Sequence, residues 1–512
     1  LGTGGFTIAG GTIDNTSGGA ITLSTNNAQI WNSDVIFTGT NDLNLGTGSV
    51  AMSANRQITT SAGTLTIAGN IGSTANYGLT VGGAGNTTIS GNIATGSGST
   101  TTVTKTGAGT LILSGSNSYQ GATNVTAGVV RVQHNSGLGA VTTGADGTFV
   151  TSGAELQLSG NITVGGEALS LSGAGIGGAS GALHNVAGNN TFGGVVTLAS
   201  PATIRNSAAG TTLTLSGGTT GANQALTVNS TGNTTISGNM ANGTGSLTKD
   251  GSGTLTFSGA TGTVGQTNLN VGTMVVGTGG ATTLNTAEFS SATSTTLLVA
   301  SGGTVNAVYG SGNTYFNGVF DATSAGTFTA TSLANTSSGL TFGASFTATN
   351  LTLNIGGSSI GGADLTDYFR LELSGVSISV GTLHITGDTI LDFNGASSTF
   401  LSSTNLTVDA NVKIVVDGWI SAANGVWRAI STVNAGTLGG SDQNGGIPLS
   451  QISFTGSAGA TTTWVSGNHD GWFDREIRPT PEPSTYGAMM IAAALAFLGY
   501  RRFIRRKAAP AA

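Results

Sequence analysis

The 512-residue sequence contains no cysteine, six prolines and few charged residues. The absence of cysteine excludes a disulfide scaffold and every metal site that is built on thiolates. Charged residues make up 7% of the chain, against roughly 25% in an average soluble domain. Fifteen lysines and arginines are too few for an extended phosphate-binding surface, which excludes nucleic acid as a partner. Collagen is excluded too, because glycine follows no three-residue period and proline is rare.

Glycine and apolar residues are abundant instead, with 87 glycines and 38% hydrophobic residues. Disorder that is driven by charge requires low hydrophobicity and high net charge, so this composition argues against it. The few basic residues are unevenly placed. Five of the fifteen lie in the last twelve positions, namely Arg501, Arg502, Arg505, Arg506 and Lys507. The sequence therefore consists of an acidic, largely uncharged body and a separate basic C-terminal segment.

A block of about seventy residues occurs twice, at about 63–133 and 210–277. Residues 79–93 read LTVGGAGNTTISGNI, residues 226–240 read LTVNSTGNTTISGNM, and eleven of the fifteen positions are identical. Within the block, short β-branched and apolar runs such as TLIL at 110–113 are closed by glycine, serine and asparagine. This pattern is typical of short β-strands separated by tight corners.

Short strands roughly every ten residues, repeated over hundreds of residues, favour a solenoid over a sandwich or a barrel. We predict an all-β fold, a right-handed parallel β-helix with coils of roughly 20–25 residues. The expected divisions are a β-helix at 1–285 with the duplicated block, a continuing β-rich solenoid and cap at 286–478, and a separate C-terminal segment at 479–512. A single transmembrane helix is expected in that last segment.

Residues 105–119 read KTGAGTLILSGSNSY and resemble the autotransporter-associated β-strand repeat of secreted passenger domains. The residues that carry this resemblance are Lys105, Gly107, Gly109, Thr110, Leu111, Ser114, Gly115, Asn117 and Tyr119. The second copy keeps Lys249, Gly251, Gly253, Thr254, Leu255, Ser258 and Gly259, but has Thr263 where the repeat has tyrosine. The resemblance implies an exported β-helical protein, and no enzymatic activity by itself.

The C-terminal segment combines three features in order: Pro481-Glu482-Pro483, an uncharged run from Ser484 to Tyr500, and the basic cluster. Seventeen uncharged residues are at the short end of the range that spans a bilayer, and the basic residues after them are expected to stay cytoplasmic. This order resembles the PEP-CTERM sorting signal. The resemblance implies a Gram-negative host and cleavage by an exosortase after retention at the cytoplasmic membrane.

Two further expectations concern export. An autotransporter ends in a membrane β-barrel, so we expect these repeats to be coupled to the PEP-CTERM route instead. The sequence starts at Leu1 without a methionine or a signal peptide, which we interpret as a processed or truncated N-terminus.

Two catalytic patterns occur, the nucleophile-elbow pattern at Gly357–Gly361 and the dinucleotide fingerprint at Gly173–Gly178. Both are expected by chance in so glycine-rich a chain, and neither has a strand-turn-helix setting. The richest acidic stretch contains Asp364, Asp367, Arg370, Glu372, His384, Asp388 and Asp392. With coils of this length, Asp367 and Asp392 could stack on one face, as in a carbohydrate-active enzyme. A solvated face or turn-forming aspartates is the favoured interpretation.

Aromatic and acidic residues also gather just before the C-terminal segment: Trp419, Trp427, Trp464, His469, Asp470, Trp472 and Asp474. They could bind sugar or Ca²⁺, but covering the end of the solenoid is the favoured interpretation. The run Asp442–Gly446 offers oxygen donors without the spacing of a calcium loop. We therefore predict no catalytic residue, metal site or cofactor.

The sequence thus predicts an exported, non-enzymatic surface or extracellular-matrix protein, structural or adhesin-like, with an exosortase and the membrane as partners. Exopolysaccharide is a further expected partner, in a biofilm matrix for example. The alternatives are a carbohydrate-active β-helix enzyme, a polysaccharide lyase or glycoside hydrolase, and a cleaved matrix protein without a specific ligand.

Overall fold

Most of the described strands of this protein pair in parallel with strands of neighbouring coils. The computed structural model describes residues 2, 4–73, 75–95, 100–141, 146–310, 312–332, 338–357, 368–373, 376–392, 400–409, 412, 414–417, 430–432, 452–454, 461–466 and 475–480. Across these residues the fold is all-β, as predicted, with one 3₁₀ turn, η1 (Ile176–Gly178), and no α-helix. Within the same ranges no helix is both long and apolar enough to cross a bilayer.

The chain divides into two compact units. The first contains Leu1–Ala307 and Asn317–Phe328, and the second contains Val308–Phe316 and Thr329–Ala512. The strands β36 (Gly303–Tyr309) and β39 (Thr327–Ser332) include residues of both units.

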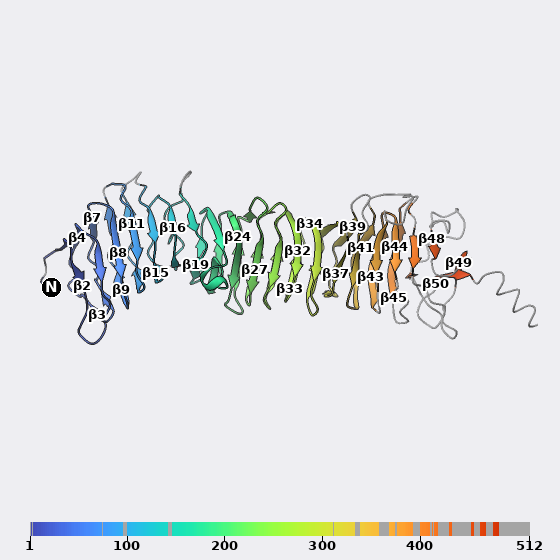
Figure 1. Cartoon of the computed structure of the whole chain (residues 1–512), viewed down its shortest axis with the longest axis horizontal. Coiled ribbons are helices and arrows are strands. Elements are labelled where there is room, and N and C mark those ends of the chain that lie inside the picture. Colours follow the sequence, from blue (N-terminus) through green and yellow to red (C-terminus); the bar gives the residue numbers. More distant parts are fainter. Residues whose placement is uncertain are drawn as a thin grey trace, which may run out of the picture. The chain divides into compact units, whose positions relative to one another are not determined.

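In the first unit, each coil contributes up to three strands, and each strand pairs in parallel with a strand of the next coil (Figure 1). One face holds the strands β1 (Phe6–Ile8), β4 (Gln29–Trp31), β7 (Val50–Met52), β10 (Ile71–Ser73) and β13 (Ile93–Thr95). A later sheet holds β20 (Thr163–Val164), β23 (Asn190–Phe192), β25 (Thr212–Leu215), β28 (Asn233–Ile236), β31 (Thr254–Phe257), β33 (Thr273–Val276), β35 (Thr296–Val299) and β38 (Val319–Phe320).

The other two faces of this unit belong to the largest sheet. One row contains β2 (Thr12–Ile13), β5 (Val35–Phe37), β8 (Arg56–Thr60), β11 (Leu79–Gly82), β14 (Val103–Lys105), β16 (Thr123–Val125), β18 (Thr148–Val150), β21 (Leu169–Gly173), β26 (Thr219–Thr220) and β29 (Met240–Ala241). The other contains β3 (Ile21–Thr22), β6 (Leu43–Asn44), β9 (Thr64–Ile67), β12 (Asn86–Ile89), β15 (Thr110–Leu113), β17 (Gly128–Val132), β19 (Ala154–Ser159), β22 (Leu183–Ala187), β27 (Leu226–Ser230) and β30 (Leu247–Asp250). The long strands β24 (Val196–Asn206), β32 (Thr261–Leu269) and β34 (Thr282–Ser291) supply both rows.

The second unit has the same kind of parallel architecture. One row contains β37 (Gly312–Phe316), β40 (Ser338–Phe342), β42 (Phe369–Glu372), β44 (Thr389–Asp392), β46 (Ile414–Asp417) and β48 (Ile452–Phe454). Another contains β41 (Phe346–Gly356), β43 (Ser377–Ile385), β45 (Phe400–Val408) and β47 (Ile430–Thr432). The strands β49 (Thr461–Ser466) and β50 (Arg475–Thr480) are antiparallel.

The coil length agrees with the sequence prediction. Gln29 pairs with Val50 and Val50 with Ile71, so each of these coils takes 21 residues (50 − 29 and 71 − 50). The parallel β-helix is therefore confirmed in each unit.

The core consists of inward-facing side chains stacked in columns. Register pairing joins Leu111 to Val130, Val130 to Leu156 and Leu156 to Leu183, and all four side chains are fully buried. Residues that alternate with them, such as Thr110, Ile112 and Arg131, face outward and are partly exposed, because a coil has one buried side and cannot enclose a core alone. Phenylalanines contribute to the core in the later part of the first unit, where the rings of Phe289 and Phe328 meet edge to face with their centroids 5.8 Å apart.

Glycine is required where the corners of successive coils touch. Gly69, Gly91 and Gly115 occupy equivalent corner positions in three consecutive coils. A Cβ atom on Gly91 would lie 2.1 Å from the carbonyl oxygen of Gly69, and one on Gly115 would lie 2.2 Å from that of Gly91. Since real Cβ contacts of this length do not occur, this glycine column permits the coils to approach.

We expect Gly91→Ala to lower the stability of the protein by about 1–3 kcal/mol, because the added methyl group has to force two coils apart. The matched control is Gly165→Ala, since a Cβ atom there meets nothing within 4 Å. Urea unfolding followed by circular dichroism measures both variants. Equal midpoints for Gly91→Ala and Gly165→Ala would contradict the close-contact explanation.

Candidate functional site

The repeat signature begins with a lysine that points into the core. Lys105 lies in β14 in register with Val81 and Val125, two apolar residues of the neighbouring coils, and is 2% exposed. Its aliphatic stem continues the apolar column, while its Nζ reaches the corner beyond the strand. There Nζ donates hydrogen bonds to three main-chain carbonyl oxygens, those of Thr106 (2.5 Å), Gly107 (2.7 Å) and Ala127 (3.4 Å).

The second copy repeats this arrangement. Lys249 in β30 is fully buried in register with Val228 and Leu269. Its Nζ donates to the carbonyl oxygens of Asp250 (3.0 Å), Gly251 (2.6 Å) and Val271 (3.0 Å). We call this arrangement the lysine clasp: one buried ammonium group joined to two carbonyls of its own corner and one carbonyl of the next coil.

The two clasps occupy different corners of the solenoid. After Lys105 the chain continues into β15, which belongs to the largest sheet, whereas after Lys249 it continues into β31 of the eight-stranded sheet. The same sequence motif therefore builds the same contacts between different pairs of faces. The clasp is a local corner structure that does not depend on one face.

Glycines of the signature make room for the clasp. Gly107 and Gly128 adopt φ values of 66° and 68°, which glycine tolerates best. A Cβ atom on Gly128 would lie 2.3 Å from the carbonyl oxygen of Gly107 and 2.8 Å from Nζ of Lys105. Gly251 and Gly272 have the same left-handed backbone in the second copy, with φ of 78° and 80°.

Burial changes the proton affinity of both clasp lysines. Removal from water disfavours an ammonium charge. It lowers the pKa of Lys105 to about 8 and that of Lys249 to about 8 as well. Near neutral pH the ammonium form supplies three donors, one for each carbonyl oxygen of the clasp.

Two more signature residues bind neighbouring coils in the first copy. Asn117 accepts a hydrogen bond from the backbone N–H of Ile93 (2.9 Å) and donates one to the carbonyl of Gly137 (2.7 Å). The hydroxyl of Tyr119, which is fully buried, forms a 2.6 Å hydrogen bond with that of Thr123. The second copy has Thr261 and Thr263 at these two places, so these contacts belong to the first copy alone.

The acidic stretch is only partly described, since Asp364 and Asp367 lie outside the described residues. The predicted stacking of Asp367 on Asp392 is therefore untested. The register partner of Asp392 in β42 is Glu372. Asp392 forms an ion pair with Arg370, and Glu372 accepts a hydrogen bond from Thr341 (3.0 Å).

The remaining residues of this stretch have separate surroundings. His384 forms a 2.7 Å contact between its Nε2 and a carboxylate oxygen of Asp409. Asp388 is fully buried. Among the described residues, no group of three or more histidine and acidic side chains is arranged to hold a metal ion.

Residues Ile176–Gly178 of the dinucleotide fingerprint form the 3₁₀ turn η1, whereas a nucleotide site requires the start of an α-helix there. Four of the six fingerprint residues have positive φ: Gly173 at the end of β21, and Gly175, Gly177 and Gly178 in the loop after it, which we call the glycine loop. The nucleophile-elbow pattern is described only at Gly357.

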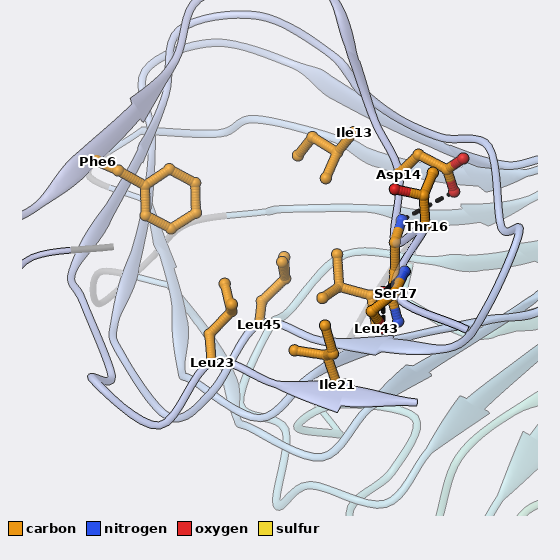
Figure 2. Close-up of a pocket in the computed structure, with 10 residues that line it drawn as sticks. Phe6, Ile13, Asp14, Thr16, Ser17, Ile21, Leu23, Leu43 and Leu45 are labelled. Carbon is orange, nitrogen blue, oxygen red and sulfur yellow. Dashed lines mark hydrogen bonds between the residues drawn. The ribbon is translucent and has the colours of Figure 1, made fainter. Parts of the chain in front are cut away.

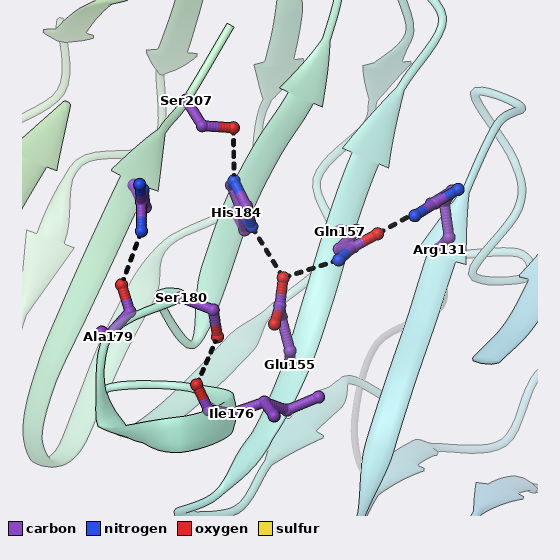
Figure 3. A network of polar contacts seen from close by, with 9 residues as sticks. Arg131, Glu155, Gln157, Ile176, Ala179, Ser180, His184 and Ser207 are labelled. Carbon is purple, nitrogen blue, oxygen red and sulfur yellow. Dashed lines mark hydrogen bonds and ion pairs between the residues drawn. The ribbon is translucent and has the colours of Figure 1, made fainter. Parts of the chain in front are cut away.

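This glycine loop lies over a polar network that sequence reasoning missed. Arg131 Nε donates to Gln157 Oε1, and Gln157 Nε2 donates to Glu155 Oε1, both at 2.7 Å (Figure 3). The same carboxylate oxygen lies 2.7 Å from Nδ1 of His184, whose Nε2 lies 2.7 Å from Oγ of Ser207. We call these five residues the histidine network. Their only sequence signal is separation by about one coil, 29 residues from Glu155 to His184 and 23 from His184 to Ser207.

A cavity of about 510 Å³ lies at the first coils (Figure 2). Its apolar walls include Phe6, Ile13, Ile21, Leu43 and Leu45. Ile21 is in register with Leu43 but is 37% exposed, so the cavity is open to solvent at these first coils and is not enclosed by the core.

Several predicted features lie outside the described residues. They are Trp419, Trp427, Asp442–Gly446, His469, Asp470, Trp472, Asp474, Pro481, Glu482, Pro483, the run Ser484 to Tyr500, and Arg501, Arg502, Arg505, Arg506 and Lys507. Trp464 is a residue of the strand β49.

Comparison with known proteins identifies the repeats. A family model for the passenger-associated-transport-repeat matches residues 103–132 and 247–276, the two segments that contain the clasps. No curated protein matches the chain in sequence. Two transport repeats within a parallel β-solenoid fit a secreted, autotransporter-like passenger.

The clasps predict an unusual dependence of stability on pH. Between about pH 8 and the ordinary lysine value of 10.5, the unfolded chain keeps lysine protons that the folded protein has released. Unfolding then takes up protons, so the free energy of unfolding rises with pH, by up to about 1.4 kcal/mol per pH unit for each lysine. We expect Lys105→Met/Lys249→Met to lack this rise.

The measurement compares urea midpoints of wild type and the double variant at pH 7.5, 8.5 and 9.5. Each single variant serves as a control and should lose about half of the difference. If the urea midpoints of wild type and the double variant change with pH in the same way, the lysines keep their ordinary proton affinity in the folded protein and the prediction is wrong.

Proposed function

We propose that this protein is an exported β-solenoid that serves as a structural or adhesive component of the cell surface or extracellular matrix, a role that needs no catalysis. The observation that carries the proposal is the pair of transport repeats, each with the same lysine clasp in a parallel solenoid. The stacked coils, with buried apolar columns inside each unit, suit a protein that presents a repetitive scaffold.

We further propose sorting through the C-terminal segment. Its support is the order of Pro481-Glu482-Pro483, the uncharged run 484–500 and the basic cluster after it. In this proposal the run holds the precursor in the cytoplasmic membrane with its basic end inside. An exosortase-type enzyme then cleaves near the Pro-Glu-Pro motif and frees the solenoid, with exopolysaccharide as the expected partner outside.

One observation favours the alternative of a carbohydrate-active enzyme. Glu372 and Asp392 are register partners on adjacent strands, and such strands lie about 4.8 Å apart. Glycosidases use paired carboxylates about 5–9 Å apart. The ion pair between Asp392 and Arg370, however, binds one of the two carboxylates to a cation. We therefore rank the surface role first.

The sorting proposal predicts that replacing Pro481, Glu482 and Pro483 with alanine leaves unprocessed precursor in the membrane fraction of an exosortase-producing host. Pro479→Ala, two positions before the motif, is the matched control and should be processed normally. Fractionation and mass spectrometry of the mature C-terminus measure both. Normal processing of the triple variant would refute the sorting role of the motif.

The surface role predicts that the full chain releases no new reducing ends or unsaturated sugars from the exopolysaccharide of its host. A chromogenic assay over several hours measures both products. Release that disappears in Glu372→Gln and Asp392→Asn, and persists in Glu288→Gln, would instead establish the carbohydrate-active alternative.

A further inference from the structure

Three consecutive coils bring a serine, a histidine and a glutamate into one chain of hydrogen bonds. Gln157 in β19 is in register with His184 in β22, which is in register with Arg205 in β24. Because side chains alternate along a strand, Glu155 and Ser207 lie on the same outer face as Gln157 and Arg205, two residues away from each. Figure 3 shows the resulting line from Ser207 through His184 to Glu155.

The direction of the protons in this line follows from Glu155. Burial alone acts to raise the pKa of this carboxyl group, but hydrogen bonds from His184, Ser180 and Gln157 outweigh burial and leave the pKa below its usual value. An ionised carboxylate only accepts hydrogen bonds. Nδ1 of His184 must therefore carry a proton toward Glu155, which leaves Nε2 of the neutral ring as the acceptor for the hydroxyl of Ser207.

The glycine loop encloses this line from one side. Ser180, at the end of the loop, donates to the carbonyl of Ile176 (3.1 Å), and the side chain of Glu155 is 3% exposed beneath it. His184 is 12% exposed, and Ser207 is half-buried at the end of the line opposite Glu155. The orienting carboxylate is thus shielded from water more than the serine is.

A positive charge lies on the same outer face as the serine. The guanidinium of Arg205, two residues before Ser207, is held by a 2.8 Å hydrogen bond from Nη1 to the carbonyl of Ala179 in the loop. This charge favours an oxyanion that forms on an acyl group attached to Ser207.

We propose that Ser207 is a nucleophile with His184 as its general base and Glu155 as the residue that positions the imidazole, and that this site cleaves small carboxylic esters. This activity goes beyond the surface role proposed above. The arrangement meets the geometric requirement of nucleophilic catalysis: a nucleophile within hydrogen-bond reach of a base, and the base oriented by a third group.

The reaction needs only ester and water. The hydroxyl proton of Ser207 passes to Nε2 of His184 as Oγ forms a bond to the acyl carbon. The bond from that carbon to the alcohol oxygen then breaks, and the leaving alcohol takes the proton from Nε2. Water next gives a proton to Nε2 and attacks the acyl carbon, after which Oγ leaves and takes this proton back. The products are the carboxylic acid and the alcohol.

The first experiment treats the full chain with a fluorophosphonate probe and maps the labelled peptide by mass spectrometry. We expect stoichiometric labelling of Ser207, none in Ser207→Ala, and full labelling in Ser170→Ala, a control serine on β21 outside the line. Hydrolysis of p-nitrophenyl acetate should show the same order. Wild-type protein without label on Ser207, or equal hydrolysis by Ser207→Ala, would overturn the proposal.

The second experiment uses the absence of cysteine from the chain. Ser207→Cys introduces a single thiol beside His184, and Ser170→Cys introduces one elsewhere as the reference. A neighbouring histidine favours the reactive thiolate, so alkylation of Ser207→Cys by iodoacetamide should reach half its maximal rate at least one pH unit lower. Adding His184→Gln should return the profile to that of the reference. Identical profiles for Ser207→Cys and Ser170→Cys would overturn the role of His184 as base.

The role of Glu155 has its own readout. Glu155→Gln donates to Nδ1 and places the ring proton on the side of Ser207, so probe labelling should slow by about 10²–10⁴-fold. In the Ser207→Cys background the same change should remove the shift in the alkylation profile. A merely structural Glu155 would lower the melting temperature and leave that profile unchanged, which would overturn its positioning role.

Discussion

The distance between successive coils, about 4.8 Å in any parallel sheet, is the constraint on which the rest of this structure depends. Every coil repeats the hydrogen-bonding positions of the coil before it, so each side chain lies directly above an equivalent one. Apolar residues therefore form columns such as Leu111, Val130 and Leu156. Corners must approach to the same distance, and there only a residue without Cβ fits, as the carbonyl of Gly69 against Gly91 demonstrates. The high glycine content is a consequence of this spacing.

The same spacing explains why a lysine can occupy the core. A corner turns the backbone away from the sheet ladder and leaves carbonyl groups that converge on the interior, where an unpaired polar group is costly. The ammonium groups of Lys105 and Lys249 bind three such carbonyls each, two within the corner and one from the next coil. Since the two clasps join different faces, the signature of the transport repeat encodes a corner. Its lysine and glycines act together, and neither has a role in the motif without the other.

The sequence was sufficient to predict the coil, because strand length, β-branched runs and duplication all reflect the repeated spacing directly. It was not sufficient to place Lys105. Alternation puts this lysine on the same side as the buried Val103, whereas the cost of burying a charge favours the solvent side, and only the corner carbonyls explain how the ammonium group is accommodated inside. The sequence was also not sufficient to predict which residues of neighbouring coils become register partners. Coil length varies from place to place, so Asp392 meets Glu372, 20 residues before it (392 − 372), and not a residue chosen from an average coil. The histidine network could not be predicted from the sequence for the same reason, because its members are separated by coils of different length.

The outer faces carry two polar groups of residues, the ion pair of Arg370 and Asp392 and the histidine network, and their geometries suit them to different roles. In the ion pair of Arg370 and Asp392 each charge is neutralised by its partner, and such a pair near the surface contributes little to the stability of the protein. The histidine network is directional instead, since the carboxylate of Glu155 fixes one ring nitrogen of His184 and leaves the other facing Ser207. In a solenoid, few residues are needed to build such a line, because three polar residues about one coil apart are enough to align three side chains. The site proposed at Ser207 therefore requires no cleft between domains. It requires an irregular segment that covers part of one outer row of side chains, and the glycine loop, which contains η1, is such a segment.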